Sequence, residues 1–325
     1  MLVFAPNHSA ALGAAIVQCL GASLAPAEER EFAGGEHKMR PLVDVQGRNT
    51  CVISSLYGDS SFSANDKLCR LLFFVGALQD AGAASVTTLV PYLAYARKDR
   101  RTQLRDPVTT RYVAAMFEAV GVDRIIALDV HNEAAFDNAF RCHSVRLEGA
   151  ETFADALADD LGQGPVAVAS PDIGGIKRAQ KLRESLARRL GREVEFGFVE
   201  KRRVGEIVSG DAFVGRVAGA QVVLYDDLIS TGTTILRAAQ AARRAGAERV
   251  RVAATHAAFV ASAAQLFVSD AIDSVLVSDS ITLPQAFRSW LDTRLRVCSM
   301  APLLAQSIYA GPHPGQGSSP TARRA

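Results

Sequence analysis

The segment that decides the fold is Val222-Val223-Leu224-Tyr225-Asp226-Asp227-Leu228-Ile229-Ser230-Thr231-Gly232-Thr233-Thr234. Its apolar first half predicts a buried strand over residues 221–225, and a short loop around Gly232 then leads into a helix over residues 233–245. Unpaired N–H groups at a helix N-terminus bind phosphate, and glycine lets a ligand approach the backbone closely. The segment therefore predicts a phosphate-binding loop in an α/β fold.

The acidic pair Asp226-Asp227, directly after the predicted strand, has two interpretations. Its carboxylates can accept hydrogen bonds from vicinal sugar hydroxyls, or they can hold a divalent cation. The alternative for the whole segment is an ordinary helix capped by Asp, Ser or Thr. Hydroxyl groups on both sides of the glycine favour a sugar phosphate, with the phosphate held by Ser230, Thr231, Gly232, Thr233 and Thr234.

Strand-like and helix-like segments alternate on both sides of this loop. The expected strands are 51–55, 85–91, 124–129, 165–170 and 249–255, and the expected helices are 10–24, 65–81, 109–120 and 175–190. Glycine follows several of these helices, as expected for a left-handed C-terminal position. Apolar strands separated by helices predict two similar domains, each a mostly parallel sheet flanked by helices.

The length of 325 residues also suggests two domains. We expect an N-terminal domain over residues 1–147 and a C-terminal domain over residues 148–300. The segment 301–310 is expected to pack back on the core. Residues 311–325 are rich in Gly, Pro and Ser and predict a disordered tail.

Composition excludes several classes of protein. With 36 Lys+Arg against 34 Asp+Glu, the net charge of +2 gives no reason to expect nucleic acid or a membrane surface as a partner. No apolar run is long enough to span a bilayer. The five cysteines are irregularly spaced and contain no CxxC pair, which predicts a reducing cytoplasm. A P-loop kinase is excluded because the sequence has no GxxxxGK[ST] motif.

The segment from Asp226 to Thr234 resembles the phosphoribosyl diphosphate-binding motif of type I phosphoribosyltransferases and of ribose-phosphate pyrophosphokinases. Further segments are similar to the pyrophosphokinases alone and follow in order along nearly the whole chain: Pro91–Arg100, Leu128–His131, Ser170–Gly175, Glu200–Arg203, Ser278–Pro284 and Met300–Ala305. The resemblance implies a type I phosphoribosyltransferase-like fold in both domains. It also implies transfer of the diphosphoryl group of ATP to the C1 hydroxyl of ribose 5-phosphate, giving 5-phosphoribosyl 1-diphosphate and AMP.

By this resemblance the C-terminal domain binds ribose 5-phosphate, with Asp226 and Asp227 on the ribose hydroxyls. Lys201 and Arg203 are implied as catalytic residues that clamp the transferring group from a flap. Without the other motifs, the run Glu200-Lys201-Arg202-Arg203 would be interpreted as a solvated basic face.

The N-terminal domain is the ATP side by the same resemblance. Arg97, Lys98 and His131 match positions that contact the nucleotide, and the fork of Arg97 suits phosphate oxygens. The adenine pocket of the family is completed by a loop from a neighbouring subunit, which here reads Phe32-Ala33-Gly34-Gly35-Glu36. Phe32 can stack on a purine and Glu36 can accept from its amino group; the bare sequence is only a turn.

The resemblance implies Mg²⁺ as cofactor, with His131, Asp172 and Asp129 as ligands. Magnesium prefers oxygen, so Asp172 is the better ligand on chemistry alone. His131 could act through a metal-bound water or orient a phosphate, and a lone histidine there would otherwise be a hydrogen-bonded residue at a strand end.

Four departures from the family pattern stand out. Gly34 replaces an Asp or Asn, Lys98 replaces a Gln, the loop Ser230–Thr234 has the form found in classes that need no free phosphate, and the flap 204–213 has an unusual sequence. They imply a divergent enzyme, insensitive to phosphate and with a relaxed choice of diphosphoryl donor.

Two other functions remain open at this point. One is a type I phosphoribosyltransferase, and the other is a non-catalytic regulatory paralogue of the same family. The expected assembly is a homo-oligomer, dimer-based and hexameric by resemblance.

Overall fold

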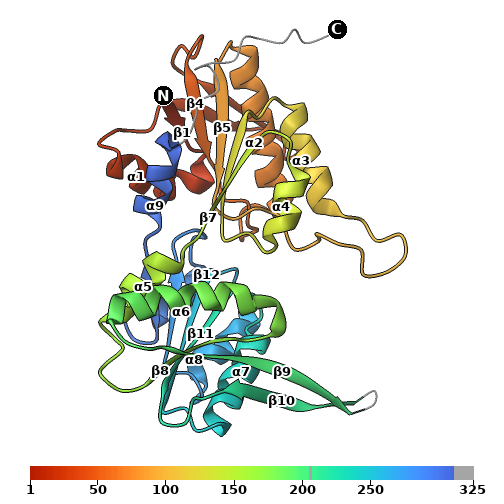
Figure 1. The fold of residues 1–325 in the computed structure, drawn as a ribbon. Helices are drawn as coiled ribbons and strands as arrows, with labels where there is room; N and C mark the ends of the chain where they lie inside the picture. Colours follow the sequence, from red (N-terminus) through yellow and green to blue (C-terminus); the bar gives the residue numbers. More distant parts are fainter. Residues whose placement is uncertain (205–206, 311–325) are drawn as a thin grey trace. The chain divides into compact units, whose positions relative to one another are not determined.

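The computed structural model describes residues 1–204 and 207–310, without the side chains of residues 201–211. The chain divides into two units (Figure 1). Unit 1 combines Met1–Leu147 with the segment that begins at Ala301, and unit 2 is Glu148–Met300. The expected tail at 311–325 lies outside the described residues, as does part of the expected flap.

Unit 1 contains a five-stranded parallel sheet with the strand order β1-β4-β5-β6-β7. A separate two-stranded antiparallel sheet is formed by β2 and β3. The elements are β1 (Leu2–Phe4), α1 (Ala10–Cys19), β2 (Ala27–Glu31), β3 (His37–Pro41), β4 (Asn49–Ile53), α2 (Ala64–Asp80), β5 (Ser85–Val90), α3 (Thr109–Ala119), β6 (Arg124–Leu128), α4 (Glu133–Ala139), β7 (His143–Leu147) and α9 (Ala301–Tyr309).

Unit 2 contains a seven-stranded sheet with the order β10-β9-β8-β11-β12-β13-β14. All its pairs are parallel except β9 with β10. The elements are α5 (Ala150–Ala158), β8 (Val166–Ser170), α6 (Ile176–Leu190), β9 (Glu195–Val204), β10 (Ile207–Gly215), β11 (Gln221–Leu228), α7 (Thr233–Arg244), β12 (Arg249–His256), α8 (Gln265–Val268), β13 (Ser274–Ser278) and β14 (Leu295–Cys298). The predicted α/β class, with mostly parallel sheets flanked by helices, is confirmed.

Each unit has its own apolar core. In unit 1, residues of β4 and β5 such as Val52 and Val86 pack against Phe74 of α2 and Phe117 of α3. The core of unit 2 is built in the same way from strands and helices, including α7. Burial of these side chains on both faces of the strands explains why the strands read as continuous apolar runs.

Helix α2 begins where the sequence supplies a capping box. The Ser63 hydroxyl accepts from the Asp66 N–H at 3.1 Å, and the Asp66 carboxylate accepts from the Ser63 N–H at 2.8 Å. These bonds satisfy backbone donors that an α-helix leaves unpaired. The start of the helix is therefore fixed.

Two predicted boundaries are wrong by three residues or more. The expected helix over 10–24 ends at Cys19, and Gly21 then takes a left-handed conformation with φ of 62°. The expected strand over 221–225 continues to Leu228, because β11 keeps pairing with β12 as far as Leu228 opposite His256. Asp226 and Asp227 are therefore part of the strand and do not follow it.

Within the described residues, no helix combines the length and the apolar character needed to cross a membrane.

Arg124 ties the C-terminal helix to unit 1. Arg124 is the first residue of β6 and is only 1% exposed. Its side chain donates to the backbone carbonyls of Ser307 at 3.0 Å, Ile308 at 3.3 Å and Ala310. These carbonyls lie at the end of α9, where an α-helix has no intrahelical donors for its last C=O groups. A buried cation thus satisfies acceptors that would otherwise lose their hydrogen bonds.

We predict that Arg124→Met lowers the free energy of unfolding by about 3 kcal/mol, because it removes charged hydrogen bonds and leaves buried carbonyls unpaired. Urea denaturation measures the change. The matched control is Arg141→Met: Arg141 also donates to a carbonyl near a helix end, that of Asn138, but is exposed, so its loss should have almost no effect. A change below about 1 kcal/mol for Arg124→Met would contradict the prediction.

Candidate active site

The loop between β11 and α7 has the geometry of an anion site. Gly232 precedes the helix with φ of 78°, and an added Cβ would come within 2.8 Å of the Leu266 side chain. Gly232 at the N-cap offers α7 no side chain, and the Thr231 hydroxyl accepts from the Thr233 N–H at 3.4 Å. Thr231, Thr233 and Thr234 are exposed, so their hydroxyls and the helix N-terminus face solvent together.

Neighbouring segments hold this loop in place. The Gln265 amide Nε2 donates to the Thr231 carbonyl at 2.8 Å, and the Val260 N–H donates to the Ser230 carbonyl at 3.2 Å. The Ile229 N–H donates to the His256 carbonyl at 3.0 Å. These bonds fix the backbone of the loop before any ligand arrives. The role of Gln265 was not predicted, because nothing local in the sequence marks a contact across 34 residues.

Asp226 and Asp227 share a cation that the sequence analysis missed. One nitrogen of Arg178, on α6, lies 3.3 Å from Asp226 Oδ1 and 3.2 Å from Asp227 Oδ1. Burial and the charge of Asp227 hold the pKa of Asp226 well above its ordinary value, while Arg178 opposes the shift. Arg178 sits in the first turn of α6, where the helix dipole disfavours cations; that unfavourable position was a usable signal.

Asp172 lies at the same edge of the sheet, just after β8. Its Oδ1 accepts from the Gly175 N–H at 3.2 Å and so caps a short 3₁₀ turn over Ile173–Gly175 ahead of α6. Parallel strands end at one edge, and β8 pairs directly with β11. Asp172 is therefore on the edge that carries Asp226 and Asp227.

Lys201 and Arg203 belong to the antiparallel pair β9–β10. β9 pairs with β8 only as far as Phe198, so the rest of β9 runs on with β10 alone (Figure 1). Lys201 stands opposite Asp211, and Arg203 opposite Val208. Their side chains lie outside the described part of the structure, so their predicted roles stay predictions.

In unit 1, the segments after β5 and β6 come together. Arg97 is exposed, whereas the Lys98 ammonium pairs with Asp106 at 3.0 Å. The Asn132 side chain, beside exposed His131, donates to Asp99 at 2.6 Å and links the two segments. The structure thus brings the segment of Arg97 and Lys98 next to that of His131, as strand ends on one sheet edge require.

Asp129 and His131 are the predicted metal ligands of unit 1. Asp129 follows β6 with φ of 40°, a conformation that Asp tolerates better than most residues. Among the residues that the structure describes, no three His, Cys, Asp or Glu side chains form a ready metal-binding group. The carboxylates of Asp129 and Asp172 have the oxygen chemistry that magnesium prefers, and magnesium commonly takes only one or two protein carboxylates beside substrate phosphates.

The segment Phe32–Glu36 is a tight turn between β2 and β3. The Phe32 N–H donates to the Glu36 carbonyl at 2.8 Å, and Gly34 and Gly35 have φ of 89° and 87°. The Phe32 ring is 49% exposed. An exposed aromatic ring at the tip of a hairpin is available for stacking on a ligand.

Comparison with known proteins accounts for both units. Residues 1–121 match the model for the N-terminal domain of ribose phosphate pyrophosphokinase, and residues 143–288 match the phosphoribosyl transferase domain. Ribose-phosphate pyrophosphokinases from Pasteurella multocida and Haemophilus influenzae are each 33% identical to this chain. Each alignment covers 94% of this chain and 94% of the relative.

The chain belongs to the ribose-phosphate pyrophosphokinase family.

The crystal structure of phosphoribosylpyrophosphate synthetase from Mycobacterium smegmatis is similar over 95% of this chain and 97% of that one, with a TM-score of 0.84 and 28% sequence identity. The predicted family and its fold are therefore confirmed. The alternative of a type I phosphoribosyltransferase would leave unit 1 unexplained. The ribose-phosphate pyrophosphokinase family explains it, because residues 1–121 match the N-terminal domain of that family.

The raised pKa of Asp226 implies that the free energy of unfolding depends on pH. A carboxyl group that binds its proton more tightly in the folded state contributes stability below its unfolded pKa, near 3.8. That contribution is lost as the pH rises through the raised folded pKa. The side chain of the Asp226→Asn variant cannot ionise. The variant and the natural protein should therefore have similar free energies of unfolding near pH 4, and the variant should become the more stable of the two as the pH rises.

Urea denaturation at several pH values measures this difference. Asp155→Asn is the matched control, because Asp155 is an exposed residue of unit 2 that pairs with Arg189. Its effect on stability should be small at every pH, because an exposed ion pair contributes little. A pH-independent effect of Asp226→Asn would show that ionisation of Asp226 does not limit stability.

Proposed function

We propose that this chain transfers the diphosphoryl group of ATP to the C1 hydroxyl of ribose 5-phosphate, giving 5-phosphoribosyl 1-diphosphate and AMP. The observation that carries the proposal is the nearly end-to-end match to relatives named ribose-phosphate pyrophosphokinase. The geometry of each unit supports a distinct ligand. We therefore assign one substrate to each.

Ribose 5-phosphate is assigned to unit 2. Its phosphate binds the loop Ser230–Thr234, where N–H groups and hydroxyls at the start of α7 meet the anion. Asp226 and Asp227 accept hydrogen bonds from the ribose hydroxyls. Arg178 supports this assignment because it orients both carboxylates and balances part of their charge.

ATP is assigned to unit 1. Exposed Arg97 suits the phosphates through its planar fork, and Lys98 and His131 lie on the same pair of segments. Phe32 stacks on the adenine and Glu36 accepts from its amino group, while Gly34 offers the base no side chain. Because Phe32 is half exposed in the single chain, we propose that this turn serves a neighbouring copy in a dimer-based homo-oligomer, a hexamer by family.

Transfer needs positioning and charge stabilisation, with no covalent nucleophile on the protein. The C1 hydroxyl attacks the β-phosphorus and releases its proton to solvent, while the bond from that phosphorus to the oxygen shared with the α-phosphorus breaks and AMP leaves with that oxygen. We assign Lys201 and Arg203 to the developing charge on the transferring group. Mg²⁺ would neutralise phosphate charge when bound, with Asp129 and His131 as ligands in unit 1 and Asp172 as a ligand in unit 2.

We propose that the enzyme acts in the cytoplasm, since Cys19, Cys51, Cys69, Cys142 and Cys298 are all reduced thiols. Neither nucleic acid nor a membrane is needed as a partner. The loop Ser230–Thr234 supports an enzyme that works without free phosphate.

The first test is formation of both products. Purified protein with ATP, ribose 5-phosphate and magnesium should release AMP and 5-phosphoribosyl 1-diphosphate in equal amounts, with or without free phosphate. Lys201→Ala should lower kcat about 100-fold or more, because a cation is lost where charge develops. The matched control is Lys181→Ala, which removes a surface lysine paired with Glu148 and should retain full activity. A folded natural protein that forms no product would instead be a regulatory paralogue.

The second test concerns the choice of donor. An added side chain at Gly34 meets nothing within 4 Å, and Asn tolerates positive φ better than most residues. We predict that the natural enzyme also uses GTP and that Gly34→Asn raises its preference for ATP over GTP about tenfold, by restoring a polar contact to the base. The ratio of kcat/KM values measures this preference. Gly35→Asn, with nearly the same φ and equal space, should leave the ratio unchanged.

A further inference from the structure

The hairpin β2–β3 carries the proposed adenine turn but belongs to no larger sheet. An isolated two-stranded hairpin is marginally stable, so its position depends on side-chain anchors. On β3, Met39 is buried in the core of unit 1. On β2, the anchor is ionic. We infer that Arg70 of α2 is a positioning residue for ATP: through Glu31 it fixes the turn Phe32–Glu36. This inference rests on the proposed role of that turn.

The contact between Arg70 and Glu31 is a two-pronged ion pair. Both terminal nitrogens of Arg70 bond to the Glu31 carboxylate, with Nη2 to Oε2 at 2.6 Å, and Nη1 also lies 3.3 Å from Glu29 Oε1. The Arg70 side chain is only 6% exposed, whereas the Glu31 side chain is 50% exposed, so solvent screens the pair in part. Such a fork fixes direction as well as distance. Glu31 is the last residue of β2 and directly precedes Phe32.

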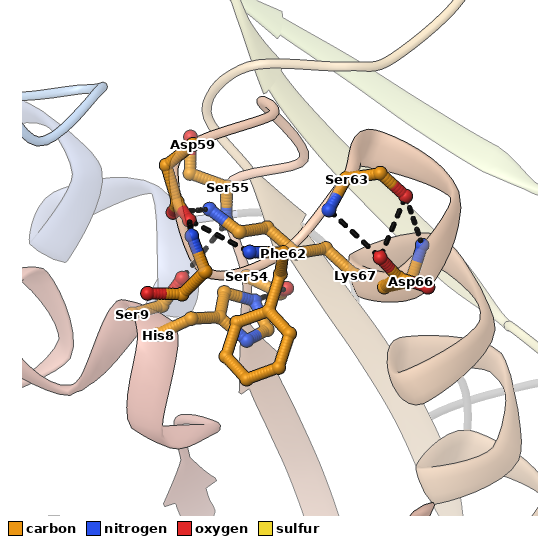
Figure 2. A network of polar contacts seen from close by, with 10 residues as sticks. His8, Ser9, Ser54, Ser55, Asp59, Phe62, Ser63, Asp66 and Lys67 are labelled. Atoms are coloured by element: carbon orange, nitrogen blue, oxygen red, sulfur yellow. Dashed lines mark hydrogen bonds and ion pairs between the residues drawn. The ribbon is translucent and has the colours of Figure 1, made fainter. Parts of the chain in front are cut away.

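Arg70 itself has a rigid base. Its guanidinium lies over the Phe62 ring, 4.1 Å from the centroid. The Phe62 N–H donates to the Asp59 carboxylate at 2.9 Å, and the same carboxylate pairs with the fully buried Lys67 (Figure 2). Lys67 and Arg70 both come from α2, whose start is fixed by its capping box. The position of the guanidinium is therefore fixed both by helix α2 and by its contact with the Phe62 ring.

Glu29 gives the hairpin a second attachment. Its Oε2 accepts from the Asn7 N–H at 2.7 Å. Asn7 follows β1, and the turn that contains Asp59 follows β4, which is parallel to β1. Both attachments therefore reach the sheet edge that also carries Arg97 and His131. The hairpin is thereby fixed to unit 1 of its own chain, from which the turn is presented to the neighbouring copy.

The position of Arg70 predicts a selective effect on binding. Arg70 bonds to the residue before Phe32, so its loss frees the turn without removing any group that contacts the nucleotide. A misplaced turn weakens ATP binding, because ordering it again costs free energy. Binding of ribose 5-phosphate, assigned to unit 2, should not change.

The test is a double-mutant cycle with Arg70→Gln, Glu31→Gln and the double variant. We expect Arg70→Gln to raise the KM for ATP about tenfold, with the KM for ribose 5-phosphate and kcat within about twofold of the natural values. If Glu31 acts through Arg70, the double variant should be no worse than Arg70→Gln alone. Arg70→Lys should restore only part of the effect, because Lys lacks the fork.

Arg40→Gln is the matched control. Arg40 pairs with Glu28 within the same hairpin, but its side chain is 55% exposed, and its loss should leave both KM values unchanged. Thermal unfolding verifies that every variant is folded. If Arg70→Gln does not fold, Glu31→Gln carries the test, because Glu31 is half exposed and its loss leaves Arg70 paired with Glu29.

Three results would overturn the inference: equal changes in the KM of both substrates, additive effects in the cycle, or the same rise for Arg40→Gln. Phe32→Ala separates this inference from the proposed function. If Phe32→Ala leaves the KM for ATP unchanged, the turn does not bind ATP and the proposed function of the turn fails. If Phe32→Ala raises that KM and Arg70→Gln does not, only the role of Arg70 fails.

Discussion

Parallel pairing of β11 with both β8 and β12 is the constraint on which the proposed sugar phosphate site depends. β8 pairs only as far as Leu224, whereas β12 continues opposite Leu228. The last residues of β11 therefore extend beyond the end of β8. Asp172 and the start of α6 follow β8 at this same edge of the sheet. Because parallel strands end at one edge, both acidic residues and the N-terminus of α7 are delivered to the same place. Unit 1 uses the same constraint for the segments after β5 and β6.

Two individually unfavourable charges support each other at that edge. Burial next to Asp227 disfavours an ionised Asp226, and the helix dipole disfavours Arg178 in the first turn of α6. Brought within about 3.3 Å, the cation and the two carboxylates offset these costs. The carboxyl oxygens held by Arg178 can accept hydrogen bonds from neutral hydroxyls. The proposed phosphate loop lies a few residues later, where Gly232 precedes α7.

The sequence predicted the parts of this site that lie within one continuous segment. Alternating apolar strands and glycine-terminated helices predicted the fold class, and the segment through Thr234 predicted a loop that leads into a helix, which the structure confirms. The missed residues act across the chain: Arg178 is 48 residues from Asp226, and Gln265 is 34 from Thr231. Periodicity carries no information on such contacts. The end of β11 was also missed, because continued pairing with β12 outweighs the low strand propensity of Asp.

Lys98 and Gly34, the two departures from the family pattern in unit 1, differ in their physical consequences. Lys98 adds a cation beside Arg97, but Asp106 pairs with it at 3.0 Å. The charge that Lys98 adds is therefore offset by the Asp106 carboxylate. Gly34 has no such compensation, since no atom lies within 4 Å of the place where its side chain would start. The missing polar group leaves open space at the turn, while Arg70 and Glu31 still hold the root of that turn firmly. A rigid turn with an open position is a physical basis for a relaxed choice of base.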